Sequence, residues 1–199
     1  MRLILARTLS ATAGLLLLTL IIARPGPPFL AGVDAACYAR VARELAERPV
    51  WDWLDVTLAG GGFFEHPPLA FWIEAAVYRL AGATAGNAVW LARAYALLFL
   101  LLLWFTSRRL RNSRAGAFTL LACALMPGFL YESQNPMLEA PLKVFMCVGV
   151  LGAVLTPTRR FLGIAAFAIG FTLALLTKGP PAFALPALPL WMLARRDIS

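Results

Sequence analysis

Long apolar runs dominate the chain and leave little polar sequence between them. They are Leu9–Ala23, Ala88–Thr106, Ala115–Tyr131, Met137–Leu155, Phe161–Thr177 and Pro181–Ala194. These runs carry no polar stripe at helical spacing, so as helices they have no face suited to water. Each approaches the length that crosses the hydrocarbon core of a bilayer, which predicts an all-α fold, a polytopic membrane helix bundle of about six transmembrane helices.

The only sizeable polar region is the segment 24–87, which follows the first run. Within Val33–Glu47, Tyr38, Val41 and Leu45 recur at three- and four-residue spacing, with charged residues on the other positions. This periodicity predicts an amphipathic helix that lies on the membrane surface.

A second surface helix is predicted over Leu69–Leu80. Pro67-Pro68 precedes it, and proline is tolerated in a first helical turn. Upstream, Gly60–Gly62 is interpreted as a loop, because no strand-to-helix signature of a phosphate-binding loop follows it. The whole chain, 1–199, is expected to form a single membrane domain in which 24–87 is the first extracytoplasmic loop.

Charge along the chain predicts the orientation of the bundle. Basic residues cluster at the N-terminus and after the second, fourth and sixth runs, as Arg2, Arg7, Arg108, Arg109, Arg111, Arg114, Arg159, Arg160, Arg195 and Arg196. All acidic residues except Asp197 fall on the other side. The positive-inside rule therefore predicts a cytoplasmic N-terminus, and the net charge of +8 reflects membrane topology and not nucleic-acid binding.

Composition supports the same class. The chain is 61% hydrophobic and 14% charged, with a mean hydropathy of +0.76, which argues against a water-soluble domain. Basic residues followed by Leu9–Ala23 have the layout of a signal peptide, but Arg24-Pro25 follows without a small-residue cleavage site, so we expect an uncleaved helix. The cysteines, Cys37, Cys123 and Cys147, show no disulfide or metal spacing.

The chemistry-bearing residues are expected to gather at the extracytoplasmic end of the bundle. They are Asp34, His66, Glu132, Asn135, Glu139, Lys143 and Lys178. A lysine at the centre of a lipid-facing helix costs roughly 2.5–3.5 kcal/mol, so Lys178 needs an interface, a cavity or an anion. A carboxylate opposite a lysine suits a reaction in which one group takes a proton and the other stabilises a leaving anion.

Five of these residues also have a purely structural interpretation. Asp34 has the position of a helix N-cap, and His66 that of a residue which caps or orients the second surface helix. Lys178 at a helix end can extend its ammonium to the interface. Glu139 and Lys143, four residues apart, have the spacing of a helical ion pair.

Together, five short motifs resemble the polytopic GT-C glycosyltransferases of the dolichyl-phosphate-mannose protein mannosyltransferase and aminoarabinose (ArnT-like) transferase type. The motifs are Asp34 with Tyr38, EHPPLAFW at 65–72, RRLRNSRAG at 108–116, NPMLEAPL at 135–142 and LLTKGP at 175–180. The resemblance implies a transferase at the extracytoplasmic face that uses a sugar linked to a polyprenyl phosphate. It also implies a multi-pass protein, which we expect in a bacterial inner membrane.

The resemblance assigns roles to individual residues. It implies that Asp34 is the general base, that Glu139 lines the same cavity and that Lys178 lies near the donor phosphate. Tyr38, His66 and Lys143 are the further candidate donor- or substrate-binding residues. No metal site or cofactor is expected, and the sequence leaves open a divalent cation, the sugar and the acceptor, which is a protein hydroxyl, lipid A or another envelope glycan.

The chain departs from the family pattern at several positions. Many members have Asp-Glu in place of Asp34-Ala35, Lys-Pro-Pro in place of His66-Pro67-Pro68, and Asp in place of Glu139. Members also have about twice as many spans, so this chain is expected to be an N-terminal half that works with a C-terminal half or a partner subunit. A membrane transporter and a non-catalytic lipid-binding subunit are the alternative functions, although no internal repeat of a transporter is visible.

Overall fold

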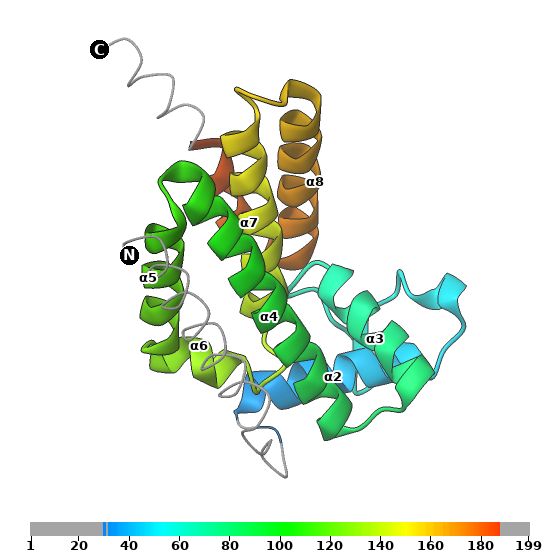
Figure 1. Cartoon of the computed structure of the whole chain (residues 1–199). Coiled ribbons are helices and arrows are strands. Elements are labelled where there is room, and N and C mark those ends of the chain that lie inside the picture. The colour runs from blue at the N-terminus through cyan, green and yellow to red at the C-terminus, as the bar shows by residue number, and fades with distance from the viewer. Residues whose placement is uncertain (1–29, 31, 188–199) are drawn as a thin grey trace.

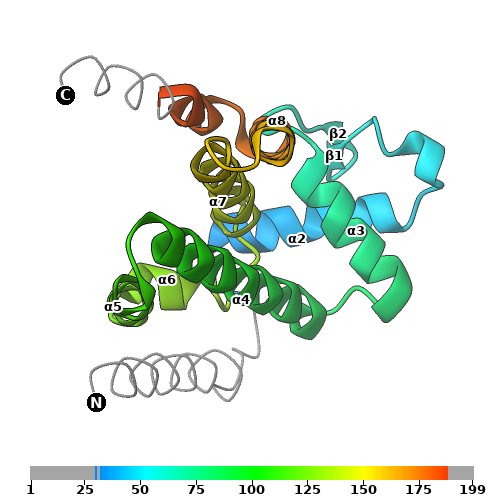
Figure 2. The same ribbon diagram turned by 45° about the horizontal axis from the view of Figure 1, so that its top comes forward.

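The structure, a computed structural model, describes residues 30 and 32–187. Helices form most of this part of the chain: α2 (Val33–Ala46), α3 (Leu69–Ala81), α4 (Ala85–Leu110), α5 (Ser113–Ala124), α6 (Pro127–Glu132), α7 (Glu139–Leu155) and α8 (Arg160–Lys178). Helix α2 lies across one end of the group formed by α4, α5, α7 and α8 (Figures 1 and 2). The mainly helical architecture agrees with the prediction from the apolar runs.

The two helices of the polar segment begin where their periodicity predicts, and they pack on each other. The predicted stripe of α2, Tyr38, Val41 and Leu45, is buried in one cluster with Phe71 of α3 and with Leu138. The stripe therefore packs on protein, which corrects the prediction that this face lies on the membrane surface.

A short β-hairpin separates α2 from α3, which corrects both the strictly all-α prediction and the loop interpretation of Gly60–Gly62. Its strands are β1 (Thr57–Leu58) and β2 (Gly61–Gly62), paired antiparallel. The turn between them has positive φ at both positions, 54° at Ala59 and 80° at Gly60. This left-handed geometry suits the tight turn of a hairpin, and glycine adopts it without steric cost.

Two helices of the described residues, α4 and α8, are long and apolar enough to cross a membrane. They contain the predicted spans Ala88–Thr106 and Phe161–Thr177. Helix α7, with 17 residues, covers most of the predicted span Met137–Leu155. The first predicted span, Leu9–Ala23, lies outside the described residues.

The sixth predicted span, Pro181–Ala194, is described only as far as residue 187. The described part begins as a 3-10 turn, Pro180–Phe183, which follows directly on the end of α8. The number of spans therefore stays a prediction.

The prediction of one continuous span over Ala115–Tyr131 is wrong. Helix α5 ends at Ala124, and the separate short helix α6 starts at Pro127, with Met126 in an extended conformation between them. Proline lacks the N–H that a continuing helix needs, and it disfavours helical geometry in the residue before it. Apolar composition indicated a span here, but Pro127 ends the helix and turns the chain.

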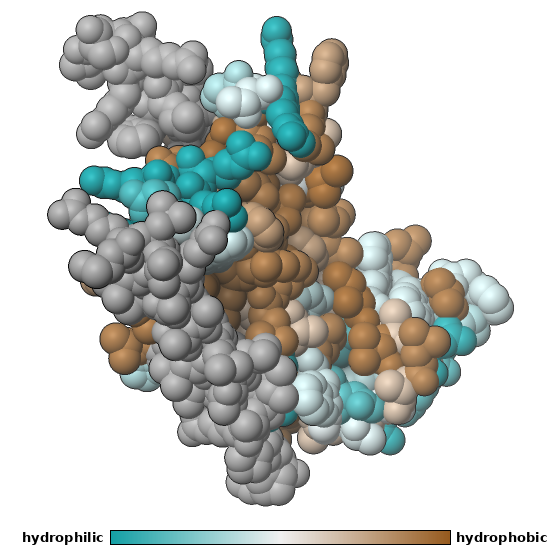
Figure 3. All heavy atoms as spheres, viewed as in Figure 1, coloured by the Kyte–Doolittle hydropathy of each residue, from teal (hydrophilic) through white to brown (hydrophobic). Residues whose placement is uncertain are grey.

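The two ends of the bundle differ in chemistry. The connections α4–α5 and α7–α8 lie at the end opposite α2 (Figure 1), and hydrophilic residues gather there beyond a largely hydrophobic side of the bundle (Figure 3). Arg108 and Arg109 belong to the last turn of α4, and Arg159 precedes α8. The basic connections therefore share one end of the bundle, and the polar helices α2 and α3 lie at the other.

Helices α7 and α8 approach each other closely because glycines line their contact. A Cβ at Gly152 would collide with the backbone nitrogen of Phe167, and a Cβ at Gly170 would collide with that of Gly149. Small residues allow such backbone approach between membrane helices, where dispersion contacts drive association. This contact matters for the site, because α7 and α8 each supply one of its charged groups.

We expect Gly152→Ala to destabilise the protein by about 1–3 kcal/mol, because the added methyl group overpacks the α7–α8 contact. Gly128→Ala is the matched control, since Gly128 is also helical but has no neighbour within 4 Å of an added Cβ. Alanine is intrinsically favoured over glycine in a helix, so the control should be neutral or stabilising. Thermal unfolding in detergent measures the stability of both variants. A Gly152→Ala protein as stable as the Gly128→Ala control would contradict this packing argument.

Candidate active site

The centre of the candidate site is an ion pair between two helix ends. Lys178, the last residue of α8, donates a hydrogen bond to Oε1 of Glu139, the first residue of α7. Both placements suit the helix dipoles, since a carboxylate is stabilised at an N-terminus and a cation at a C-terminus. The side chains are partly exposed, 25% for Lys178 and 34% for Glu139, so the pair remains open to a ligand.

Glu139 has further binding capacity. Its second oxygen, Oε2, is buried and has no hydrogen-bond partner among the described residues. A buried carboxylate oxygen without a donor is costly. The arrangement therefore leaves an acceptor position next to the Lys178 ammonium for a hydroxyl group or a water molecule.

A second pair joins α2 to the segment before α3. The hydroxyl of Tyr38 lies 3.1 Å from Nε2 of His66, and their ring centroids are 5.6 Å apart in an edge-to-face arrangement. Phe71 and Phe63 contact the same two rings. The aromatic packing holds the His66 ring against Tyr38 of α2.

Asp34 lies in the first turn of α2, one helical turn before Tyr38, and its side chain is exposed. The pKa of Tyr38 is raised to about 12, first by burial and then by the negative charges of Asp34, Glu139 and Glu65. These carboxylates are therefore close enough to act on one phenol. Tyr38 stays neutral at physiological pH and keeps its O–H as a hydrogen-bond donor.

The chain segments that carry His66 and Lys178 also touch. Pro67, the residue after His66, places its Cγ 4.0 Å from where a Cβ on Gly179 would stand. Gly179 follows Lys178 and has a φ of 67°, which ends α8 in a left-handed turn. The fold therefore brings together α2, the start of α3, the start of α7 and the end of α8.

The interpretation of Asp34 as a helix cap is wrong, and so is the capping part of the interpretation of His66; that His66 orients α3 stays a prediction. Gly32 is the N-cap of α2 and Pro68 that of α3, and neither helix has a side-chain cap hydrogen bond. Gly32, with a φ of 101°, turns the chain into α2, and Asp34 is two residues further on, within the first turn of the helix. Both side chains are therefore available for other contacts.

The predicted ion pair between Glu139 and Lys143 is also wrong. Lys143 donates to Oε2 of Glu132 at the end of α6, and its ammonium lies 5.8 Å from the centroid of the Phe129 ring. Glu139 and Lys143 lie on the same helix, but each pairs with an oppositely charged residue on a neighbouring element. Asn135, another predicted site residue, is buried and donates to the carbonyl of Tyr131 at 2.9 Å.

Sequence reasoning missed a buried carboxylate beside the site. Glu74 of α3 accepts a 2.7 Å hydrogen bond from Tyr78 and lines a small cavity with Tyr95 of α4. Burial raises the pKa of Glu74 to about 7. Its position within the apolar face of Leu69–Leu80 was the available signal, because an acidic residue at a core position of a helix requires a partner.

Glu74 should make stability depend on pH. Its folded-state pKa of about 7 lies above its ordinary 4.5, so the folded protein binds the extra proton and stability falls as pH rises through this window. The full effect is on the order of 3 kcal/mol, since one pKa unit corresponds to about 1.4 kcal/mol. Glu74→Gln keeps an acceptor for Tyr78 but has no titratable group at this position. We therefore expect the melting temperature of this variant to change little between pH 5 and 8. A wild-type profile that is flat there would contradict the prediction.

No group of three or more histidine, cysteine, aspartate or glutamate side chains that could hold a metal occurs among residues 30 and 32–187.

Three comparisons with known proteins bear on the assignment. The family description "dolichyl-phosphate-mannose-protein mannosyltransferase" matches residues 65–199. No curated protein matches the chain.

Two solved structures of ArnT from Cupriavidus metallidurans share the fold. The apo structure is 24% identical, with a TM-score of 0.75, and the alignment covers 94% of this chain and 36% of that one. The structure bound to undecaprenyl phosphate is 25% identical, with a TM-score of 0.75, and the alignment covers 98% of this chain and 36% of that one. The chain thus spans about a third of the length of ArnT.

The family match, together with this fold, defines an integral membrane protein of the GT-C type. Because the family match extends over more than half of its residues, the chain belongs to the dolichyl-phosphate-mannose-protein mannosyltransferase family. The resemblance inferred from its five motifs is confirmed.

Proposed function

We propose that the chain forms the N-terminal part of a membrane glycosyltransferase that moves a sugar from a polyprenyl-phosphate donor to an envelope acceptor. The observations that carry the proposal are the Glu139–Lys178 ion pair and the Tyr38–His66 contact, together with the charges of Asp34 and Glu139, which both raise the pKa of Tyr38. The undecaprenyl phosphate in the related ArnT structure supports a polyprenyl-phosphate donor.

The proposed reaction is an inverting displacement. Asp34 accepts the proton of the acceptor hydroxyl, whose oxygen attacks the anomeric carbon of the donor sugar. The bond between that carbon and the phosphate oxygen breaks, and polyprenyl phosphate leaves with the electron pair. Lys178 stabilises the phosphate, because an ammonium has three donors and only one of them is used by Glu139.

The remaining site residues have binding roles in this proposal. Tyr38 and His66 hold the donor or acceptor through hydrogen bonds, and Glu139 positions Lys178 and accepts from a sugar hydroxyl. Lys143, one turn along α7 from Glu139, contributes a second cation toward the substrate, held by Glu132. The reaction requires no metal in this scheme.

The proposed orientation follows from the charges. The basic ends of α4 and α8 face the cytoplasm, and α2 and α3 lie at the extracytoplasmic surface within the 24–87 loop. Together with the first and the last predicted runs, Leu9–Ala23 and Pro181–Ala194, this arrangement gives the chain about six spans. The membrane in this proposal is a bacterial inner membrane. The rest of the enzyme, as a C-terminal part or a partner subunit, closes the site.

Transfer assays in proteoliposomes test the function. Protein purified from membranes with any partner bound should consume a sugar linked to undecaprenyl phosphate and release undecaprenyl phosphate in step with glycosylation of an acceptor. Movement of labelled sugar donor across the bilayer without its consumption would instead support a transporter. If neither occurs while the donor still binds, the chain is a lipid-binding subunit.

A further inference from the structure

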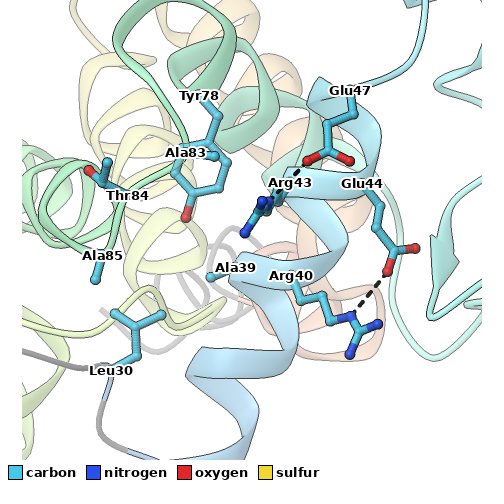
Figure 4. Close-up of a pocket in the computed structure, with 10 residues that line it drawn as sticks. All are labelled: Leu30, Ala39, Arg40, Arg43, Glu44, Glu47, Tyr78, Ala83, Thr84 and Ala85. Atoms are coloured by element: carbon cyan, nitrogen blue, oxygen red, sulfur yellow. Dashed lines mark hydrogen bonds and ion pairs between the residues drawn. The ribbon is translucent and has the colours of Figure 1, made fainter.

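A second pocket lies on the face of α2 away from the candidate site. It has a volume of about 540 Å³ and opens between α2, Tyr78 of α3 and the start of α4 (Figure 4). Arg40 and Arg43 line it from α2. At 100° per residue, this face is turned well away from the buried stripe that contains Tyr38, so the pocket is separate from the proposed active site.

The two arginines are held in place but retain free donors. Arg40 bonds to Glu44 at 3.2 Å and Arg43 to Glu47 at 3.0 Å, in both cases through Nε. The terminal Nη groups of both arginines have no hydrogen-bond partner within the described part of the chain. A guanidinium fixed through Nε presents its remaining donors as a fork that matches the oxygens of a phosphate.

The opposite wall adds positive potential. Thr84 is the N-cap of α4, and its side chain accepts from the amide of Asn87. The other first-turn amides, which begin at Ala85, have no acceptor within the helix. Thr84 and Ala85 both line the pocket, so the positive end of a 26-residue helix dipole faces the arginines across it.

The carboxylates of the pocket differ in their freedom. Glu44 is tied to the hairpin, where it accepts from the amide of Ala59 at 2.8 Å and from the hydroxyl of Thr57 at 3.0 Å. Among residues 30 and 32–187, Glu47 bonds to Arg43 through Oε1 only, and its side chain is 64% exposed. Its second oxygen is therefore available to a cationic group that lies beside a phosphate.

The pocket lies beside one end of a helix that can cross the membrane, where lipid headgroups would be. It adjoins the first residue of α4, which is long and apolar enough to span the membrane. Trp90, between one and two turns further along α4, is 53% exposed, and tryptophan is enriched at the membrane interface. The guanidinium of Arg93 lies 4.9 Å from its ring centroid.

We propose that this pocket binds the headgroup of a zwitterionic phospholipid with a primary amine, of the phosphoethanolamine type. The phosphodiester bonds to Arg40, Arg43 and the first turn of α4, and the ammonium bonds to Glu47. The formal charges of the four charged side chains of the pocket, Arg40, Arg43, Glu44 and Glu47, sum to zero. This balance favours a zwitterion over an anionic headgroup. The bound lipid fixes the angle between α2 and α4.

Lipid binding by the delipidated, detergent-solubilised protein tests this proposal by native mass spectrometry. Phosphatidylethanolamine should bind at least tenfold more tightly than phosphatidylcholine or phosphatidylglycerol with the same acyl chains. Arg40→Gln/Arg43→Gln should weaken its binding by about tenfold or more. Ala83→Trp, which fills the pocket without a change of charge, should do the same.

The control is Arg109→Gln/Arg111→Gln, which removes two charges at the far end of α4 and should leave lipid binding unchanged. Equal affinity for the three lipids, or unaltered binding in both pocket variants, would overturn the proposal. So would displacement of the lipid by millimolar inorganic phosphate, because the site would then recognise the anion alone. None of these outcomes depends on glycosyltransferase activity.

Discussion

Replacement of Asp34 by asparagine should lower the rate of sugar transfer by about 10²–10⁴-fold, the usual contribution of a general base. Asparagine is nearly isosteric but cannot accept the acceptor's proton at neutral pH. The fold should survive, because Asp34 is exposed and Gly32, not Asp34, is the N-cap of α2. The measurement is the turnover rate in proteoliposomes, together with donor affinity, which should change little.

Asp52→Asn is the matched control for this prediction. Asp52 belongs to the same polar segment but lies in the 3-10 turn Val50–Asp52, after α2. Its replacement should leave turnover within about twofold of the wild type. Near-normal turnover of Asp34→Asn would show that Asp34 does not act as the base.

Lys178→Gln should weaken donor binding by roughly 10–100-fold and reduce turnover as well. The loss corresponds to one hydrogen bond between charged groups, worth about 1.5–3 kcal/mol. Binding of undecaprenyl phosphate alone isolates this interaction, since the phosphate is the part that Lys178 contacts in the proposal. A titration of the lipid phosphate against the purified protein gives the affinity.

A double variant separates this role from a structural one. Lys178→Gln removes the cation that pairs with Glu139, so the single variant also leaves a carboxylate without its partner, which is destabilising. Lys178→Gln/Glu139→Gln removes both charges and should recover stability but not phosphate affinity. Recovery of phosphate affinity in the double variant would mean that Lys178 serves only to neutralise Glu139.

Local sequence pattern predicted the helices well where a single face decides the structure. The stripe of α2 indicated a helix over Val33–Glu47, and Pro67-Pro68 marked the start of α3, because periodicity and proline act within one or two turns. The hairpin at Thr57–Gly62 escaped prediction, since its strands have two residues each. Pro127 was overlooked inside an apolar run, although a proline ends a helix regardless of how apolar its neighbours are.

The partners of the candidate residues could not be predicted from spacing along the chain. Glu139 and Lys178 stood out because charges within apolar runs are costly and need a reason, whereas Asp34 was chosen through the family resemblance. Spacing suggested that Glu139 pairs with Lys143, four residues away, but its partner is Lys178, at a separation of 39 residues. Glu74 belongs to no recognisable sequence motif. Its cavity with Tyr95 forms only because α3 packs on α4.

The sequence by itself therefore determined the class of protein, the family and the elements that carry charge, because hydropathy, proline and helical periodicity act over short distances along the chain. The tertiary structure alone decided which charges meet. In a weakly polarisable interior the attraction between charges depends steeply on distance and geometry, and the glycine-lined contact of α7 and α8 sets that distance for Glu139 and Lys178.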